Sequence, residues 1–349
     1  MHSTRCADQR HKLTVMLAVI TAFFAAGLSE SRAEEVETLS TYLVQSVCLD
    51  TGNNITRRLP FDADCGASRP MTEDDPVLWR KHDWGGSEGP TTGWQISDAV
   101  SAQRDGMAFV DQTFDFGAPA TDNSGRPDAF RRFDGNDGGD AIVASGDTAS
   151  VFLTQDGGTP GLQWFVGENC ERPGRDRYIS WVLFKTDVGP DWHSLVAALR
   201  DRPNDICPRK FSQAFTRYKR VTDTYPVRRI DPNGSETRRM VTLPTILSEH
   251  YDRPTIDASG SMERFYYAAR LGKVRWEAWS ADAGKSAQAA TLARSGRCPP
   301  LADSAPPGSG WMMVDCRMWT NIVIEPDASV WHVRDFNWPP ADLKLQPAR

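Results

Sequence analysis

The sequence predicts a mainly β fold, an antiparallel β-sandwich of the jelly-roll type with minor peripheral helices. Short apolar runs recur along the chain, and Gly, Pro, Asn and Asp bound them, which is typical of strands in a sandwich core. Aromatic and β-branched residues alternate with polar residues in several runs, as in strands with one buried face. No repeat of solenoid or propeller length occurs in the sequence, which favours one continuous β-domain.

The first 33 residues indicate a signal peptide for export. Basic residues precede an apolar run from Leu13 to about Leu28, which is shorter than a comfortable membrane span. Ser31 and Ala33 are small residues at the positions that a cleavage site favours, so the mature chain is expected to begin at Glu34. No other stretch of the sequence approaches transmembrane length. We therefore expect an exported protein, periplasmic or extracellular, with no membrane span in the mature chain.

Composition limits the classes of partner. The full chain has a net charge of −6, and removing the signal peptide leaves 36 Lys and Arg residues against 44 Asp and Glu residues, a net charge of −8. Nucleic acid is an unsuitable partner for such an acidic chain, because its phosphates would be repelled. The basic cluster from Arg217 to Arg239 is a local exception, which we interpret as a solvated pair of strands around a turn.

Cysteine usage agrees with export. Without Cys6 of the signal peptide, six cysteines remain, an even number suited to disulfides in an oxidising compartment. We favour consecutive pairing, because it closes three separate local loops. The expected disulfides are Cys48–Cys65, Cys170–Cys207 and Cys298–Cys316. No Cys-x-x-Cys motif occurs, which argues against thiol redox chemistry and against zinc.

The N-terminal half is expected to consist of short strands joined by turns. Predicted strands cover Thr41–Asp50, two arms within Gln95–Phe116, Ala141–Leu153, Leu162–Val166 and Tyr178–Thr186. Arg104-Asp105-Gly106 supplies the reversal between the two arms, since Gly adopts the conformations that a tight turn needs. A peripheral helix is predicted over Trp192–Arg200, because Asp191 can cap it and Pro203 can end it.

The C-terminal half combines strands with one further helix and a linker. Its predicted elements are a strand over Arg238–Leu247 that leads into Ser248–Arg253, then a short loop, a hairpin over Ser261–Ser280 and a helix over Ala281–Arg294. A stretch rich in Pro, Gly and Ser then covers Pro299–Gly310, where a small C-terminal unit could begin. Two closing strands are expected within Trp311–Pro326 and Ser329–Pro340. The whole mature chain, residues 34–349, is expected to form a single secreted domain.

The hairpin over Ser261–Ser280 contains the candidate functional face. Two runs of aromatic and β-forming residues flank Arg270-Leu271-Gly272-Lys273, where Gly272 can supply a positive φ. With an even-numbered loop, even positions of the first arm share a face with odd positions of the second. This pattern predicts a core face and an exposed, concave polar face. The core face would carry Glu263, Phe265, Tyr267, Ala269, Val274, Trp276 and Ala278, and the exposed face Arg264, Tyr266, Ala268, Arg275, Glu277 and Trp279.

Glu249 and Glu277 are the candidate catalytic pair of a glycoside hydrolase. Two carboxylates across a sugar-binding groove can act as acid and base, or as acid and nucleophile. Burial beside Trp or Tyr would raise one pKa and a neighbouring arginine would lower the other, which separates the two roles. The competing interpretation is a ladder of arginine–glutamate pairs across adjacent strands without catalysis. The candidate substrate-binding residues are His250, Tyr251, Arg264, Tyr266, Arg275 and Trp279.

Two other functions stay open. His250, Tyr251 or Tyr266 could remove the C5 proton of a uronic acid while an arginine neutralises its carboxylate, which would make a polysaccharide lyase. Alternatively the same face could hold a polysaccharide or oligosaccharide without cleaving it, as in a glycan-binding or cell-envelope protein. Export, acidity and β-richness fit all three functions. Only the paired carboxylates favour the hydrolase, which is the function expected from the sequence.

One segment partly matches a calcium loop, although the function expected above requires no cofactor. Asp134, Asn136 and Asp140 offer oxygen ligands, and a glycine stands at the sixth position. Ser145 then occupies the place of the bidentate glutamate, so an ordinary Asn/Asp/Gly turn competes with calcium as the explanation. Zinc is not indicated, because the remaining histidines lack ligand spacing: His82, His193 and His332.

The chain contains twelve tryptophans, and several stand beside predicted loop ends. Flat aromatic rings suit the apolar faces of sugars, while the indole N–H still donates a hydrogen bond. Most tryptophans are expected in the core, and Trp279 is the one expected in the groove. The loop-end candidates are Trp84, Trp94, Trp279, Trp319 and Trp338.

Overall fold

A computed structural model describes residues 39–72, 74–76, 79–84, 92–95, 99–104, 107–115, 137–145, 148–153, 164–165, 181–185, 188–200 and 211–324. All of these residues belong to one compact unit, Thr38–Arg349. Several predictions fall outside the described residues. They concern the signal peptide at 1–33, the pair Cys170–Cys207, Asp134 with Asn136, Trp338, and the strand within Ser329–Pro340.

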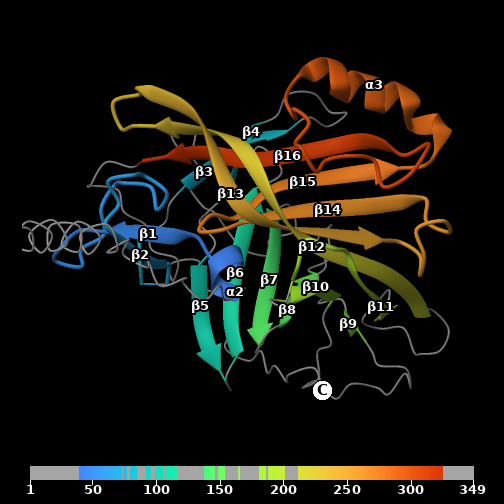
Figure 1. The fold of residues 1–349 in the computed structure, drawn as a ribbon, viewed down its shortest axis with the longest axis horizontal. Coiled ribbons are helices and arrows are strands. Elements are labelled where there is room, and N and C mark those ends of the chain that lie inside the picture. The colour runs from blue at the N-terminus through green and yellow to red at the C-terminus, as the bar shows by residue number, and fades with distance from the viewer. Residues whose placement is uncertain are drawn as a thin grey trace, which may run out of the picture. The chain divides into compact units, whose positions relative to one another are not determined.

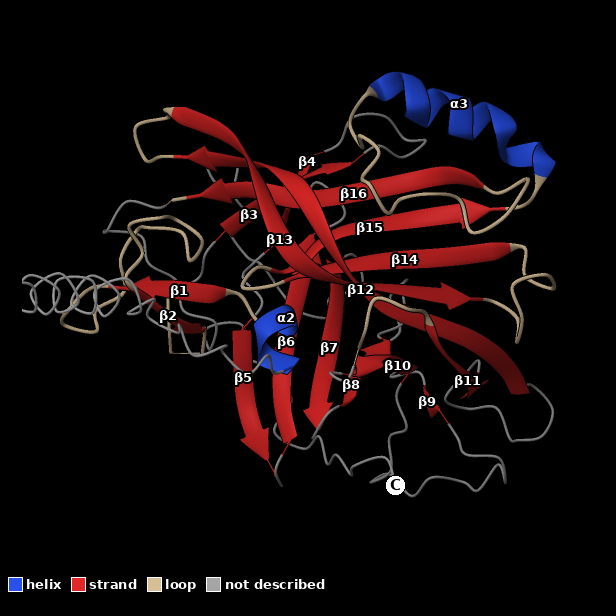
Figure 2. Cartoon of the chain, viewed as in Figure 1, coloured by secondary structure: helices blue, strands red, loops and turns tan. Residues whose placement is uncertain are grey.

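Strands dominate the described residues, and helices are few and short (Figure 2). The helical elements are α2 (Leu39–Leu43), the 3-10 helix η1 (Ala283–Lys285) and α3 (Ser286–Ser295). The strands are β1 (Ser46–Leu49), β2 (Ala67–Pro70), β3 (Trp79–Trp84), β4 (Thr92–Gln95), β5 (Ala99–Arg104), β6 (Met107–Asp115), β7 (Asp137–Ser145), β8 (Thr148–Leu153), β9 (Trp164–Phe165), β10 (Trp181–Lys185), β11 (His193–Arg200), β12 (Phe211–Ile230), β13 (Glu236–Tyr251), β14 (Ser261–Ala268), β15 (Gly272–Ser280) and β16 (Met312–Val323). The predicted mainly β fold with minor helices is confirmed, whereas the sandwich arrangement stays a prediction.

The described strands form two sheets (Figure 1). β1 and β2 make a small antiparallel pair. The other fourteen strands follow one hydrogen-bonded path, β10-β8-β7-β6-β4-β3-β16-β15-β14-β13-β12-β11-β9, with β5 paired to β6. Strands far apart in sequence meet on this path, because β3 pairs with β16 in antiparallel register. The path therefore places β16 between the N-terminal strand β3 and β15, the second strand of the hairpin that contains the candidate face.

One additional pairing closes five strands into a ring. Residues 228–230 of β12 run parallel to residues 321–323 of β16. Because β12, β13, β14, β15 and β16 are also paired in succession, this part of the sheet closes on itself at one end. In Figure 1 the long, twisted hairpin of β12 and β13 runs across the neighbouring strands. Ring closure decides which face of these strands is turned inward.

Side chains from all five strands of the ring form one buried apolar cluster. Tyr225, Leu243, Tyr266, Val274 and Ile322 are members, one from each strand. Alternation along a strand directs such side chains to a common face, which ring closure turns inward. Burial of a large apolar side chain contributes roughly 1.5–3 kcal/mol, so this cluster stabilises the closed ring.

The predicted hairpin over Ser261–Ser280 is confirmed as β14 and β15. Gly272 has a φ of 73°, the positive value expected for the turn. Arg270 has a φ of 67°, which residues with a Cβ rarely adopt. Backbone hydrogen bonds hold Arg270 in place: its N–H donates to the Thr41 carbonyl at 2.7 Å, and its carbonyl accepts from the Ser46 N–H at 2.9 Å.

The predicted pairing of faces holds on one side of a register shift and fails on the other. Tyr266 lies opposite Arg275, as the even-numbered loop predicts. Beyond the shift Tyr267 lies opposite Lys273, so Val274 is an extra residue in its strand. Val274 therefore leaves the face predicted for it and packs beside Tyr266 in the buried cluster.

Two local predictions are wrong. The helix predicted over Trp192–Arg200 is strand β11, which pairs with β12 along its whole length, because sheet hydrogen bonds override a weak local helix signal. The strand predicted over Thr41–Asp50 begins only at Ser46, after the α2 turn. The strand predicted over Arg238–Leu247 is confirmed and is longer than predicted, since β13 covers Glu236–Tyr251. The helix predicted over Ala281–Arg294 is confirmed, and Gly296 ends it with a φ of 64°.

Both disulfides among the described residues have the predicted consecutive pairing. Cys48 bonds to Cys65 and Cys298 bonds to Cys316, across sequence separations of 17 and 18 residues. Disulfides form and persist in oxidising compartments, so they indicate an exported protein. Within the described ranges, no helix has the length and apolar character needed to cross a bilayer.

Candidate functional site

The predicted polar face carries a row of alternating charges. Arg217, Glu249 and Arg264 lie directly opposite one another on β12, β13 and β14, and Glu277 of β15 lies opposite Arg264. Arg275 stands two residues before Glu277, on the same face of β15. Oppositely charged cross-strand neighbours attract each other, so the strand register itself assembles the row. We call these five side chains the charged row.

Glu249 is fully occupied by hydrogen-bond donors. Its Oε1 accepts from Arg264 Nε at 2.9 Å and from Arg264 Nη2 at 2.6 Å. Its Oε2 accepts from Arg217 Nε and from the Tyr251 hydroxyl, both at 2.5 Å. A carboxylate offers about four acceptor positions, so Glu249 has none left for a substrate or a water.

Glu277 is occupied in the same way. Its Oε1 accepts from Arg275 Nε at 2.7 Å and from the Tyr266 hydroxyl at 3.1 Å. Its Oε2 accepts from Trp279 Nε1 at 2.8 Å and from Arg264 Nη1 at 3.2 Å. Arg264 therefore bridges the two glutamates. This arrangement matches the ladder of arginine–glutamate pairs that the sequence offered as the alternative to a catalytic pair.

Four of the five side chains of the charged row are buried, and the prediction of an exposed concave face is wrong. Glu249, Glu277 and Arg275 are 0% exposed, and Arg264 is 2% exposed. The face expected to form the core is only partly buried at four positions, namely Glu263, Phe265, Trp276 and Ala278. Periodicity fixes which residues share a face but not which face turns inward. Closure of the ring turns the charged face inward.

The segment 299–310, expected to be a linker, packs onto the charged row. The Pro299 carbonyl accepts from Arg275 Nη1 at 2.6 Å, and the Ala305 carbonyl accepts from Arg264 Nη2 at 2.9 Å. Leu301 is buried in the apolar cluster inside the ring. The segment thus supplies backbone carbonyl acceptors for Arg264 and Arg275, whose guanidinium N–H groups are not all hydrogen-bonded within the strands.

Two buried atoms close to this segment lack a hydrogen-bond partner among the described residues. They are Asp223 Oδ2 and Arg275 Nη2. The other Asp223 oxygen accepts from the Ala302 N–H at 3.2 Å. Burial raises the pKa of the Asp223 carboxyl, and the nearby Arg275 charge offsets this only in part. The interior beneath the segment therefore holds a carboxylate that is poorly compensated.

The other titratable groups around the glutamates are held in one protonation state. Burial, with the Glu249 charge, raises the pKa of Tyr251, and burial, with the Glu277 charge, raises the pKa of Tyr266. Burial alone would lower the pKa of Arg264, but the two carboxylates outweigh it and raise that pKa. The phenols stay protonated and the guanidinium stays charged. General acid–base catalysis needs instead a group with a pKa near the working pH.

His250 lies on the opposite face of β13 from Glu249 and Tyr251, since neighbouring residues alternate. The ring is buried, with Nδ1 3.2 Å from Thr216 Oγ1 and Nε2 2.9 Å from Ser248 Oγ. Burial lowers the pKa of His250 to about 3, so the imidazole is neutral. The groups expected to form a lyase site are therefore not brought together: His250 is enclosed, and Tyr251 donates to Glu249.

Trp279, the tryptophan expected in the groove, is buried beside the charged row. The Arg264 guanidinium lies over its ring, 5.0 Å from the centroid, and its indole N–H donates to Glu277. The ring therefore stacks with a guanidinium instead of presenting a free surface to a sugar. Of the other loop-end candidates, Trp84, Trp94 and Trp319 all lie within strands, β3, β4 and β16.

The calcium interpretation stays a prediction. Asp140 lies in strand β7, and its two proposed partners fall outside the described residues. In the part of the chain that the structure describes, no group of three or more His, Cys, Asp or Glu side chains could hold a metal ion.

An open cleft that was not predicted lies at the turn end of the β12–β13 hairpin. It has a volume of about 600 Å³ and is formed by loop residues 59–64 and by the hairpin. Charged residues of both signs line it, namely Asp62, Asp64, Asp231, Arg229, Arg238 and Arg239. The basic cluster from Arg217 to Arg239 was the sequence signal for the hairpin side of this cleft. Loop 59–64, which forms the other side, lies far earlier in the chain, and no local sequence pattern connects it with the hairpin.

Comparison with known proteins leaves the family open. No family model and no curated protein matches this chain. One similar solved structure is "a putative lipoprotein from Parabacteroides distasonis ATCC 8503", with 7% identity over 72% of this chain and 97% of that chain, and a TM-score of 0.29. Another is "a putative exported protein with YmcC-like fold" from Bacteroides fragilis, with 11% identity, coverages of 72% and 98%, and a TM-score of 0.27. At these TM-scores neither alignment supports an inference about this chain.

Proposed function

We propose that this exported protein binds a glycan without cleaving it. The observation that carries the proposal is the condition of Glu249 and Glu277, whose four oxygens are buried and each accept two hydrogen bonds. A glycosidase needs one carboxyl that protonates the leaving oxygen and a second that attacks the sugar or activates water. Neither role is open to a carboxylate enclosed by fixed donors. Of the hydrolase, lyase and binding interpretations, binding alone requires no free carboxylate or base.

The open cleft supports a hydroxyl-rich ligand. Sugar hydroxyls both donate and accept hydrogen bonds, and the cleft presents carboxylates and guanidinium groups side by side. The disulfides support an oxidising compartment, which an extracellular or envelope polysaccharide would share. The charged row then serves as a rigid framework that holds the β12–β13 hairpin.

The test is to incubate the mature protein with a panel of neutral and uronic-acid polysaccharides. We expect no new reducing ends and no absorbance from unsaturated sugars, together with retardation by at least one polymer in an affinity gel. Protein that has been reduced and denatured serves as the control for nonspecific retardation. New reducing ends would replace the proposal with a hydrolase, and ultraviolet absorbance would replace it with a lyase. A protein that no polymer retards would overturn the proposal.

A further inference from the structure

We infer that Trp192, together with Ser194 and Val196, binds a neutral sugar residue by stacking. This inference rests on the proposed glycan-binding function, to which it adds a contact site and a class of ligand. We call these three side chains the stacking face. Four observations support it: its exposure on the sheet, the bracing of the tryptophan ring, the balance of the nearby charges, and the polar groups next to the ring.

The stacking face continues the sheet face of the charged row onto β11. Ser194 lies directly opposite Arg217, a member of the charged row. Directly opposite residues share a face, and alternation along the chain places Trp192 and Val196 on it as well. The other four members of the row are buried, whereas Trp192 is 37% exposed and Val196 is 53% exposed. This sheet face is therefore closed inside the ring and open to solvent on β11.

The Trp192 ring is braced before any ligand arrives. The Arg217 guanidinium lies 4.2 Å and Lys219 Nζ 5.0 Å from the ring centroid. Arg217 is itself held by Glu249 at 2.5 Å, and Lys219 is held by Asp303 at 2.6 Å. Both cations belong to β12, so they contact the ring from that side, and its exposed part lies on the side away from β12. A ring that is already fixed loses little conformational entropy on binding.

The charges around the ring favour a neutral ligand. Arg217 and Lys219 each have a carboxylate partner, so no surplus positive charge is left to select an acidic sugar. Asp191 is exposed beside Trp192 and would repel a carboxylate on the ligand. A cationic ligand is disfavoured too, because the two cations already at the ring would repel it.

Polar groups on the stacking face suit the hydroxyls of a sugar. The Ser194 hydroxyl can donate and accept, and the Trp192 indole N–H can donate. Among the described residues neither group has a hydrogen-bond partner. A hexose with equatorial hydroxyls, such as β-linked glucose, presents C–H groups on both ring faces and hydroxyls at its rim. Its flat face fits the indole, and its rim can bond to the polar groups.

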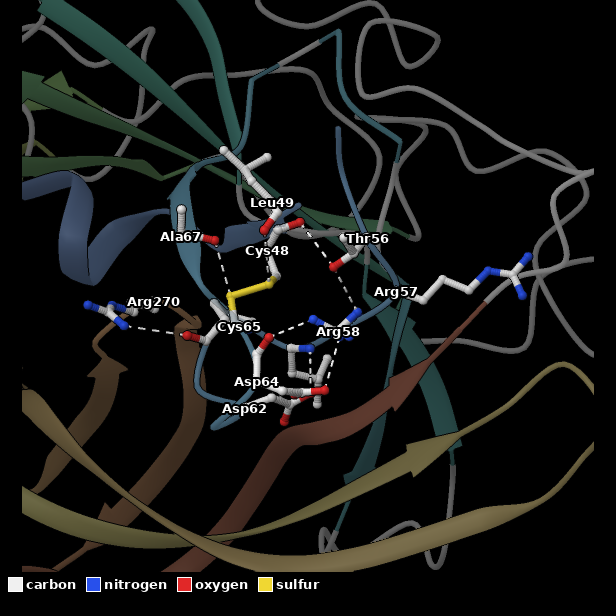
Figure 3. Close-up of a disulfide and its surroundings, with 12 residues drawn as sticks. Cys48, Leu49, Thr56, Arg57, Arg58, Asp62, Asp64, Cys65, Ala67 and Arg270 are labelled. Carbon is white, nitrogen blue, oxygen red and sulfur yellow. Dashed lines mark hydrogen bonds and ion pairs between the residues drawn. A yellow bond between two sulfur atoms is a disulfide. The ribbon is translucent and has the colours of Figure 1, made fainter. Parts of the chain in front are cut away.

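The stacking face is separate from the open cleft. The cleft lies at the turn end of the β12–β13 hairpin, beside Asp62 and Asp64 (Figure 3). Trp192 instead contacts Lys219, which is roughly 30 Å along β12 from Arg229 of the cleft. A polysaccharide can reach both regions, whereas cellotetraose is too short to do so. A tetrasaccharide therefore binds one region at a time, and substitutions at Trp192 show which.

The experiment measures the binding of cellotetraose by the folded mature protein, with tetragalacturonic acid as the acidic comparison. Trp192→Ala is expected to weaken cellotetraose binding about tenfold, because the stacking surface is lost. Trp192→Phe should keep part of the affinity, since it retains a smaller aromatic face without the N–H. Isothermal titration gives the affinities, and thermal unfolding should show that the variants fold.

Trp276→Phe is the matched control. Trp276 is also partly exposed and has a guanidinium over its ring, with Arg317 5.1 Å from the centroid. It lies on the opposite face of β15 from Glu277, so this variant should bind like wild type. Tryptophan fluorescence adds a direct readout: cellotetraose should shift the emission of wild type and of Trp276→Phe, but not that of Trp192→Phe.

The outcomes separate this inference from the proposed function. If wild type binds cellotetraose and Trp192→Ala binds it equally well, the site lies elsewhere while glycan binding stands. Preference for tetragalacturonic acid, or binding of another polymer of the panel without cellotetraose, overturns the neutral ligand but not glycan binding. Equal weakening by Trp276→Phe would show a general effect of losing a tryptophan and overturns the site. If no saccharide binds, both the inference and the proposed function fail.

Discussion

The charged row and the open cleft are built from the same kinds of side chain, arginines beside carboxylates, in opposite surroundings. In the row, Arg264 and its glutamates are excluded from water, whereas Arg239, which pairs with Asp62 in the cleft, has a side chain that is 46% exposed. A buried ion loses its hydration and must recover the cost from its partners, so every acceptor in the row is occupied. An exposed pair contributes about 0–1 kcal/mol to stability. The contrast teaches that the buried pairs are committed to the fold, while the exposed pairs of the cleft contribute little to its stability.

The largest effect is expected from breaking the row. Glu277→Gln should lower the free energy of unfolding by about 3–5 kcal/mol, because Arg264 and Arg275 would keep buried charges without their shared carboxylate. The measurement is urea unfolding of the mature protein. Glu263→Gln is the matched control, since Glu263 lies on the opposite, partly exposed face and accepts from Trp276 Nε1 at 3.2 Å; its effect should stay below about 1 kcal/mol. An effect of Glu277→Gln as small as that of the control would reopen Glu277 as a catalytic group.

A second prediction separates the two regions through their disulfides. Replacing either Cys48 and Cys65 or Cys298 and Cys316 by alanine should cost about 3 kcal/mol, since the closed loops are of similar length. Binding should distinguish the variants. Loss of the first disulfide should loosen loop 59–64 beside the cleft and weaken retardation by the polysaccharide that binds the wild-type protein, while loss of the second should leave binding by the folded fraction unchanged. Unfolding curves and binding titrations under the same conditions check both points; the reverse pattern would place the site near the charged row.

The smallest effect concerns the poorly compensated carboxylate under segment 299–310. Asp223→Asn should raise the free energy of unfolding at pH 7 by about 1 kcal/mol, because it removes a buried charge with an unsatisfied oxygen. Burial raises the pKa of Asp223 in the folded state above its ordinary value of 3.8. The charged carboxylate therefore destabilises the folded state increasingly as pH rises from 3.8 to the raised pKa, and by a constant amount at higher pH. The difference between variant and wild type should therefore shrink as pH falls toward 3.8. A variant that is less stable at pH 7 would show that Asp223 is a net favourable partner of Arg275.

The sequence allows the local arrangement of the hairpin to be predicted, because alternation and turn chemistry are local. Gly272 at the turn, the shared face of Arg264, Arg275 and Glu277, and the consecutive pairing of Cys298 with Cys316 all follow from neighbouring residues. The extra residue at Val274 could not be predicted, since a bulge changes the register without a distinctive residue type.

The inward orientation of the charged face and the position of the cleft depend on contacts between distant segments. The face of Glu277 turns inward because β12 pairs with β16, and no periodicity within β14 or β15 contains that information. Segment 299–310 has the composition of a linker, yet its carbonyls bond to the buried arginines. The cleft likewise needs loop 59–64 to meet the start of β13. In each case the composition of the segment predicted an irregular or solvent-exposed structure. Contacts with distant segments instead gave the segment a specific position in the fold.

The parallel pairing of β12 with β16 also has a consequence for folding order. The ring cannot close until Asn321 reaches Arg228, and contacts across so long an interval form slowly because of the entropy of loop closure. Until then the future interior of β14 and β15 faces water. Incomplete β-sheets usually aggregate through apolar faces and free edges, but this face presents Arg264, Arg275 and Glu277. We therefore expect the half-folded, newly exported chain to stay soluble for longer than one whose interior is wholly apolar.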